Sequence, residues 1–170
     1  TFHASIGWDW ISTVRGRNIG IWNDVRVVSE GLVSLDSPYV LTQLPLPDTT
    51  SAVLTPEVIA KNNSDEPVSG VLKGMIGDIA FEQNVTLAPG EERIVRFDPK
   101  TYPQLKVENP RLWWPNGYGK PELYSASFSF EIAGTESDRT DFNVGIRQVD
   151  TKEIDEGLHI YINGRRFIGR

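Results

Sequence analysis

The ten residues LYSASFSFEI, from Leu123 to Ile132, alternate between apolar and polar side chains. Successive side chains of a β-strand point to opposite faces of the sheet, so this alternation predicts a strand with two different faces. One face is expected to be buried and the other, with its serines, to face water, as is typical of antiparallel sheets. The predicted buried face consists of Tyr124, Ala126, Phe128, Phe130 and Ile132.

Comparable strands are predicted along the rest of the chain. No window of 11 residues or more has the apolar spacing of a helix, and 11 Pro and 15 Gly punctuate the sequence. Pro56 suggests an edge position or a bulge for its strand, because proline cannot donate a ladder hydrogen bond. Polar turns are predicted at 62–67 and 88–91. The other predicted strands are 2–6, 19–28, 52–62, 68–76, 79–87, 94–97 and a hairpin over 158–168 that turns at Asn163-Gly164.

Strands in this succession predict an all-β fold, an immunoglobulin-like β-sandwich of successive antiparallel strands. The chain has 170 residues and no cysteine, so the Cys-Trp-Cys core of antibody domains is absent and the likeness is one of architecture. A chain of this length can bury a hydrophobic core without disulfides or metals.

Charge and composition exclude several functions. The net charge of −6 argues against a general nucleic-acid or anionic-membrane binder, since both need a positive surface. No apolar run approaches the roughly 20 residues of a membrane span, and Thr1-Phe2-His3 does not open a signal peptide. His3 and His159 are isolated, so no metal site is predicted, and nothing in the sequence implies a cofactor.

Three stretches of the sequence together carry a family resemblance. The first is GWDW at 7–10 with RNIGIWNDV at 17–25. The second is NPRLWWPNGYG at 109–119 with PELY at 121–124, and the third is NVGIR at 143–147 with INGRRFIGR at 162–170. In this order they resemble glycoside hydrolase family 2 and span nearly the whole chain. The first stretch is more similar to the β-mannosidase and exo-β-glucosaminidase branch than to the β-galactosidases.

The resemblance implies a fragment of a larger enzyme. Residues 1–30 would be the end of a sugar-binding jelly roll, and residues 31–147 an immunoglobulin-like β-sandwich domain. Residues 148–170 would be the linker and first hairpin leading into a (β/α)8 catalytic barrel. Partners of the segment would then be those two domains, through intramolecular contacts, and a β-linked glycoside in the full-length enzyme. Localisation stays open, with a periplasmic or secreted enzyme as one expectation.

Catalysis is not expected of this chain alone. Members of the family are retaining glycosidases that use two carboxyl groups about 5 Å apart, and the resemblance implies that both lie on the barrel, beyond Arg170. The Asn-Glu pair usual for the acid does not occur in the sequence. Neighbouring acids at 91–92 and 155–156 are typical of solvated turns. We therefore expect no catalytic residue here and no hydrolase activity from the chain on its own.

Asp9 and Trp10 are the candidate substrate-binding residues, in the intact enzyme only. The resemblance implies that the loop around Asp9 enters the mouth of the barrel, where its carboxylate could accept hydrogen bonds from sugar hydroxyls. Residue types alone also allow a turn aspartate that caps local N–H groups. Trp10 could stack on a sugar or pack at a domain border.

Trp113 and Trp114 suggest a sugar platform, but adjacent strand residues point to opposite faces. One ring is therefore expected in the sandwich core and the other at a domain border. Two functions remain open for the chain. It could be a non-catalytic segment that positions the sugar-binding domain against the barrel, or a stand-alone carbohydrate-binding or adhesion module with an exposed row of aromatics.

Overall fold

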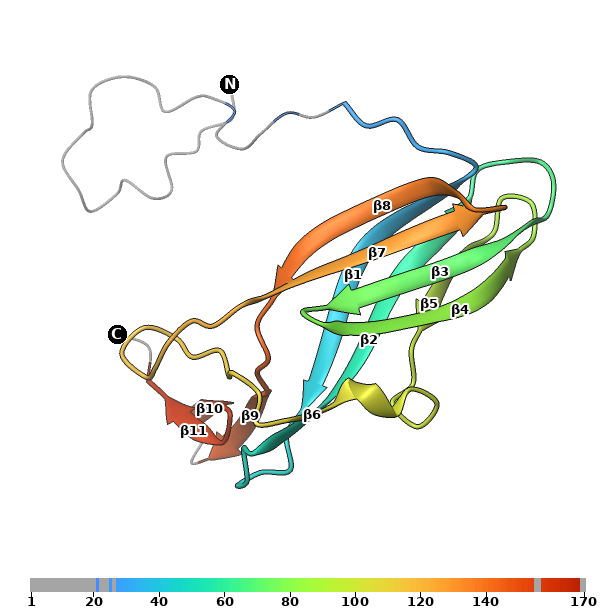
Figure 1. Ribbon diagram of the computed structural model, residues 1–170. Helices are drawn as coiled ribbons and strands as arrows, with labels where there is room; N and C mark the ends of the chain where they lie inside the picture. The colour runs from blue at the N-terminus through green and yellow to red at the C-terminus, as the bar shows by residue number, and fades with distance from the viewer. Residues whose placement is uncertain (1–20, 22–24, 26, 155–156, 169–170) are drawn as a thin grey trace, which may run out of the picture.

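The computed structural model describes residues 21, 25, 27–154 and 157–168, and its regular elements are nearly all strands. Two four-stranded sheets form a sandwich, and a smaller three-stranded sheet lies at one end of it (Figure 1). No helix of the described residues is long and apolar enough to cross a membrane. The elements are β1 (Val33–Gln43), β2 (Ser51–Asn62), β3 (Val68–Ile76), β4 (Ile79–Leu87), β5 (Glu92–Arg96), the 3₁₀ helix η2 (Pro103–Leu105), β6 (Lys106–Glu108), β7 (Tyr124–Ile132), β8 (Thr135–Val144), β9 (Val149–Ile154), β10 (Gly157–Ile162) and β11 (Arg165–Phe167).

The chain crosses between the two sheets rather than running through one. The first sheet has the order β1-β2-β5, with β6 also paired to β2, and the second has the order β4-β3-β7-β8. All of these pairings are antiparallel. The turns at 62–67 and 88–91 are confirmed, and each carries the chain to the opposite sheet, so the strands are not simply successive neighbours. This arrangement confirms the predicted all-β, immunoglobulin-like sandwich.

The sandwich is filled by apolar side chains that alternate along each strand. Strand β7 behaves as its sequence predicts, because Ala126, Phe128 and Phe130 are buried against the opposite sheet. Phe128 is 1 % exposed and lies 6.2 Å from both Phe81 and Phe97 between ring centroids. Burying one such side chain contributes about 1.5–3 kcal/mol to stability. These phenylalanines therefore hold the two sheets together.

The edge of β1 is completed by side chains of β8. Ser137 Oγ accepts a hydrogen bond from Val33 N–H at 2.9 Å and donates to Val33 O at 2.9 Å. Asp138 Oδ2 accepts from Leu35 N–H at 2.7 Å. These bonds satisfy backbone groups that an unpaired edge strand would leave exposed. They also close one side of the sandwich.

The prediction for Pro56 is wrong, and the list of predicted strands is incomplete. Pro56 lies in β2, a central strand, and the register of β2 with β1 does not shift at this residue. It sits between the stretch of β2 that pairs with β6 and the stretch that pairs with β5. Its missing N–H therefore interrupts no ladder hydrogen bond. Most of the predicted strand 19–28 lies outside the described residues. Its described members Ile21, Val25, Val27 and Val28 are exposed and in no strand. Strands β1, β8 and β9 had no clear signal in the sequence.

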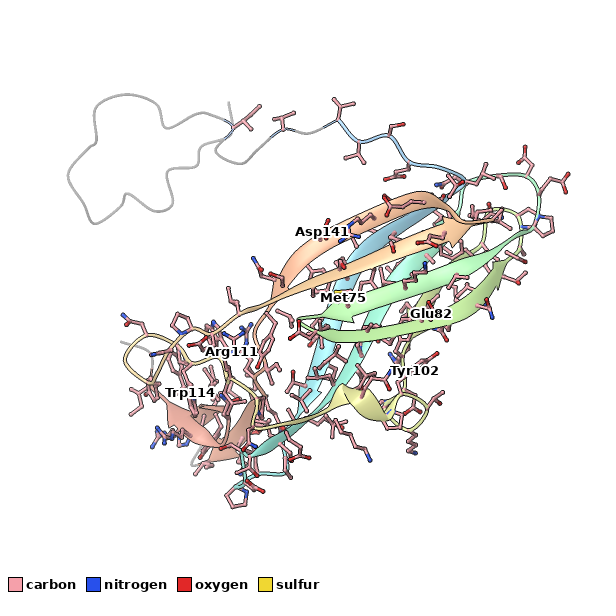
Figure 2. All side chains as sticks on the ribbon, viewed as in Figure 1. Met75, Glu82, Tyr102, Arg111, Trp114 and Asp141 are labelled. Atoms are coloured by element: carbon pink, nitrogen blue, oxygen red, sulfur yellow. The ribbon has the colours of Figure 1, made fainter. Side chains whose placement is uncertain are left out.

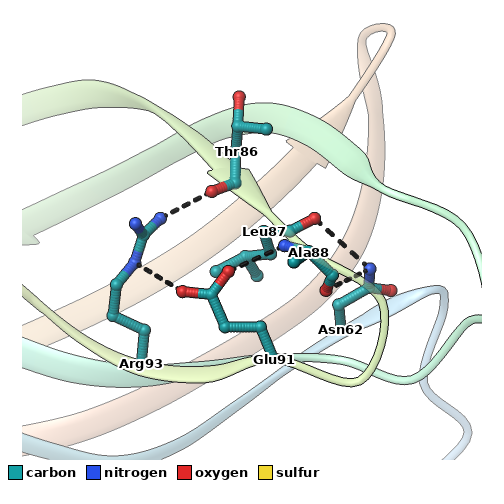
Figure 3. Close-up of polar contacts among 6 residues, drawn as sticks. All are labelled: Asn62, Thr86, Leu87, Ala88, Glu91 and Arg93. Atoms are coloured by element: carbon teal, nitrogen blue, oxygen red, sulfur yellow. Dashed lines mark hydrogen bonds and ion pairs between the residues drawn. The ribbon is translucent and has the colours of Figure 1, made fainter.

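A hydrogen-bonded corner joins the turns at 62–67 and 88–91 (Figure 3). Asn62 is fully buried, and its Nδ2 donates to Glu66 O at 2.7 Å and to Ala88 O at 3.0 Å. Glu91 accepts a bond from Ala88 N–H at 2.7 Å and lies 3.6 Å from Arg93 Nε. Glu91 is thus a structural residue of this turn.

Glu91→Ala is expected to lower the free energy of unfolding by about 1 kcal/mol, because it leaves Ala88 N–H without its charged acceptor. Glu92→Ala, at the neighbouring exposed position, is the matched control and should stay within about 0.5 kcal/mol. Urea unfolding of the three proteins gives both values. Equal losses in the two variants would contradict a specific role for Glu91.

Candidate interdomain junction

The functional candidate among the described residues is the junction, by which we mean the contact between the end of the sandwich and the sheet β9–β10–β11. Strand β10 pairs with β9 on one side and with β11 on the other. The predicted hairpin is confirmed: Ile162 pairs with Arg165, and Asn163 and Gly164 turn the chain with φ of 49° and 78°. Both residues lie in the left-handed region that a two-residue hairpin turn requires.

Asn163 ties three segments together. It is 3 % exposed, and its Oδ1 accepts a hydrogen bond from Gln148 N–H at 2.9 Å. Its Nδ2 donates to Trp113 O at 3.0 Å, and its backbone N–H donates to Gln148 O at 2.9 Å. One buried side chain therefore joins the hairpin tip, the β8–β9 connection and the Trp113 loop. Asn in a hairpin turn is a local signal, and nothing in the sequence shows these distant partners.

Gln148 extends this network back into the sandwich. Its Oε1 accepts from Leu44 N–H at 2.7 Å, just beyond the end of β1, and its Nε2 donates to Asp150 at 3.0 and 3.1 Å. The β1–β2 loop also reaches the hairpin, since a Cβ at Gly164 would lie 3.2 Å from Leu46. The small sheet is thus held from two sides of the sandwich end.

Trp113 and Trp114 lie in the junction, and the prediction that one ring fills the sandwich core is wrong. Both side chains are half-buried. Arg147 lies 4.3 Å from the centroid of Trp113, and Arg165 of β11 lies 4.9 Å from that of Trp114. Each pair is within cation–π range. The loop leaves the sandwich before these residues, so both rings pack at its end, as Figure 2 shows for Trp114.

Glycines allow the close approach of backbone to these rings. A Cβ at Gly145 would lie 2.8 Å from Cβ of Trp113, and a Cβ at Gly119 would lie 2.8 Å from the Trp114 ring. Tyr118 completes the contact, with its ring 5.5 Å from Phe167 and its hydroxyl accepting from Ile168 N–H at 3.0 Å. Two of the stretches that resemble the family in sequence therefore meet in space, namely 109–119 and the described part of the third stretch, 143–147 with 162–168.

Asp48, in the β1–β2 loop, is a titratable group whose pKa is displaced. The backbone N–H and then the hydroxyl of Thr50 hold the pKa of Asp48 below its usual value through hydrogen bonds at 2.8 and 2.7 Å. Because the folded pKa is the lower one, the carboxylate stabilises the fold above about pH 4, the unfolded value, and this contribution is lost as pH falls through the folded pKa.

Thr50→Val is expected to raise the pKa of Asp48 toward its ordinary value, because it removes the hydroxyl donor and leaves the N–H donor. Thr50→Ser keeps both donors and should keep the pKa low. A carboxyl-carbon NMR titration measures the three proteins. The loop geometry would be refuted if Asp48 titrated at the same pH in all of them.

The predicted substrate-binding residues, Asp9 and Trp10, lie outside the described residues, as does the predicted strand 2–6. Asp155 and Glu156 do as well. Within 27–154 and 157–168, no group of three or more His or acidic side chains is arranged to hold a metal ion. His159 lies 3.3 Å from an Arg166 nitrogen.

Solved structures of glycosidases share this arrangement. An exo-chitosanase of Amycolatopsis orientalis matches with a TM-score of 0.70 and 27 % identity, over 81 % of this chain and 16 % of that one. A β-galacturonidase of Eisenbergiella tayi shares the fold, with a TM-score of 0.61 and 21 % identity over 81 % of this chain and 22 % of that one. The class of protein is therefore a β-sandwich domain of the kind found in glycoside hydrolases.

The chain belongs to the glycosyl hydrolases of family 2, whose family model matches residues 33–147. An exo-β-D-glucosaminidase of Streptomyces avermitilis is 36 % identical over 98 % of this chain and 19 % of its own length. A β-mannosidase of Rattus norvegicus is 34 % identical over 77 % of this chain and 14 % of its own length. The chain thus spans about a fifth or less of these relatives, and the resemblance seen in the sequence is confirmed.

Proposed function

We propose that this chain is a non-catalytic segment of a retaining family 2 exo-glycosidase, in which the immunoglobulin-like sandwich holds a sugar-binding domain in position against a catalytic barrel. The carrying observation is the junction, where Asn163 and Gln148 bind the small sheet to the sandwich through four hydrogen bonds that each involve a backbone group. Such a network resists hinge motion because each of its buried polar groups would lose a partner on opening.

The domain boundaries follow from the same proposal. Residues 1–30 would end a jelly roll, residues 31–147 would form the sandwich domain, and residues 148–170 would enter the barrel. The family match over 33–147 and the compact sandwich between Val33 and Val144 support the two boundaries of the sandwich domain, at residues 31 and 147. In this arrangement the sandwich contributes to catalysis only by geometry.

The proposed reaction of the whole enzyme is hydrolysis of a β-linked glycoside at a chain end, of the glucosaminidase or mannosidase type. The named relatives support this substrate class. Asp9 would accept hydrogen bonds from sugar hydroxyls beside the scissile bond, and Trp10 would pack against the sugar or a neighbouring domain. Asp9→Asn in the full-length enzyme should raise KM more than it lowers kcat, and unchanged kinetics would remove Asp9 from the site.

An independent carbohydrate module would need an open row of aromatic rings. In the described part of the chain, Trp113 and Trp114 are half-buried with Arg147 and Arg165 placed over them, which favours the positioning role. The direct test is hydrolysis of aryl β-glucosaminide and aryl β-mannoside by the purified chain. We expect no turnover above buffer, and turnover that scales with protein concentration would overturn the proposal.

A further inference from the structure

A polar trough lies on the outer face of the sheet β4-β3-β7-β8, away from the junction. We define it by the floor residues Ser127 and Ser129 of β7 and by the walls Lys73 and Met75 of β3, Glu82 of β4, and Glu136 and Arg139 of β8. Glu131 closes it near one end of β7, and its volume is about 510 Å³. Figure 2 shows Met75 and Glu82 on this face of the sheet.

The register of the sheet creates the trough. Ser129 pairs with Lys73 on one side and with Arg139 on the other, while Ser127 pairs with Met75 and Asp141. Long side chains on β3 and β8 thus flank short ones on β7. Neighbouring strands lie about 4.8 Å apart, so the walls stand roughly 10 Å apart, which suits the width of one pyranose ring with its hydroxyls.

Ser129 supplies an unused hydrogen-bonding group at the base of the trough. Its side chain faces away from the core, yet it is only 9 % exposed, whereas the alternation of β7 predicts a fully wet serine. Its hydroxyl forms no hydrogen bond within the described part of the chain. Thr42 Oγ1 is the buried side-chain oxygen without a partner among the described residues, so the Ser129 hydroxyl stays accessible at the base of the trough, where water or a ligand can bond it.

The charges of the walls are only partly paired. Lys73 Nζ bonds Glu131 at 2.6 Å, and Arg139 binds Asp141 with three contacts of 2.8–3.1 Å. These bonds raise the pKa of Lys73 and of Arg139 and lower that of Asp141. Glu82 and Glu136 have no ion-pair partner among the described residues. Together with Glu131 and Asp141 they make four carboxylates, against the two cations Lys73 and Arg139.

This face is unsuited to an apolar partner. Its floor is serine and its walls are mostly charged. Phe81 and Tyr102 also line it, but Met75, 49 % exposed, is the large apolar side chain of this face that is most open to water. Protein interfaces, by contrast, are depleted of charge at their centre. The neighbouring edge of β4 is also closed, because Tyr102 Oη donates to Glu82 O at 2.9 Å and Gln104 Nε2 donates to Ala80 O at 3.1 Å. An added strand would find those carbonyls occupied.

We propose that the trough binds a β-linked amino-sugar oligosaccharide as an accessory site, an inference that rests on the glycosidase function proposed above. Sugar hydroxyls would bond Ser127, Ser129 and the free donors of Arg139, and a ring face would pack on Met75. Protonated amino groups would lie near Glu82 and Glu136, which are three strand spacings, about 14 Å, apart across the sheet and two residues, about 7 Å, apart along it. Such a site would hold a polymeric substrate near the enzyme without taking part in hydrolysis.

The test is NMR titration of the 170-residue chain with a β-1,4-linked glucosamine tetramer and, separately, with its neutral N-acetylated counterpart. We expect the amide signals of 73–75, 127–131 and 136–139 to shift with the amine form and binding at least tenfold weaker with the N-acetylated form. Shifts elsewhere, equal affinities or no binding would overturn the site. None of these outcomes bears on hydrolysis by the chain, which tests the proposed function separately.

Paired variants separate a built site from general attraction to an acidic chain. Glu82→Gln with Glu136→Gln should weaken binding about tenfold. Glu92→Gln with Glu108→Gln changes the net charge equally, on exposed residues of the other sheet, and should leave binding within twofold. Ser129→Ala, which keeps the fold, should weaken binding severalfold. Equal losses in the two double variants would show non-specific binding and refute the site.

Discussion

Replacement of Phe128 by alanine is expected to lower the free energy of unfolding by about 3–5 kcal/mol, because it empties the centre of the aromatic cluster between the two sheets. Phe128 is 1 % exposed and stacks on Phe142 at 5.9 Å as well as contacting Phe81 and Phe97. Chemical denaturation followed by tryptophan fluorescence measures the change. Phe128→Leu, which keeps most of the volume, should cost about 1–1.5 kcal/mol.

Tyr39→Ala is the control for this prediction, since Tyr39 is an aromatic residue of β1 that is 54 % exposed. Its loss should cost less than about 1 kcal/mol. If Phe128→Ala and Tyr39→Ala were equally mild, the two sheets would not be held together by the phenylalanine cluster.

Replacement of Asn163 by glycine is expected to lower stability by about 2–3 kcal/mol and to release the sheet β9–β10–β11 from the sandwich. Gln148 N–H and Trp113 O would lose their partners, at about 1–1.5 kcal/mol each. Glycine is chosen because the φ of 49° at this position would strain alanine, so the change isolates the side chain. Hydrogen exchange of β10 amides should rise while that of β7 amides stays slow.

Ala133→Gly is the matched control for this second prediction. Ala133 has φ of 50° in an exposed turn between β7 and β8, so the same residue is introduced into the same backbone region without loss of a contact. It should be neutral or slightly stabilising. Exchange that rises equally in the sandwich and in the small sheet of Asn163→Gly would contradict a local role at the junction.

Alternation in single strands is visible in the sequence, and it correctly locates β2, β3, β4, β7 and the β10–β11 hairpin. Each of these strands has an apolar face, which shows in the sequence as alternating apolar and polar residues. Strand β1 does not show this alternation, because a bulge between Asp36 and Tyr39 changes which residues point to the core. Strand β8 lacks the alternation because it is an edge strand rich in polar residues. Two of its side chains accept hydrogen bonds from the backbone of β1.

The junction depends on long-range contacts that no local pattern encodes. Asn163 is read from sequence as a turn residue, which it is, but its bond to Trp113 O spans 50 residues. From the sequence, one ring of Trp113 and Trp114 is expected in the core because large aromatics are usually buried, yet the chain leaves the sandwich before both residues and an arginine lies over each ring. Ser129 likewise obeys the alternation of β7 but is enclosed by its neighbours' long side chains.

The most direct test of the positioning role is the relative orientation of the sandwich and the small sheet in solution. Residual dipolar couplings measured on the chain are fitted separately for the sandwich, residues 33–144, and for the small sheet, residues 149–154 and 157–167. Each fit yields an alignment tensor, and the two tensors are compared. If the junction holds the two parts rigidly, one tensor fits both sets with equal magnitude and direction. A clearly smaller tensor for the small sheet would mean that it moves independently, and the sandwich could then not position the domain that follows.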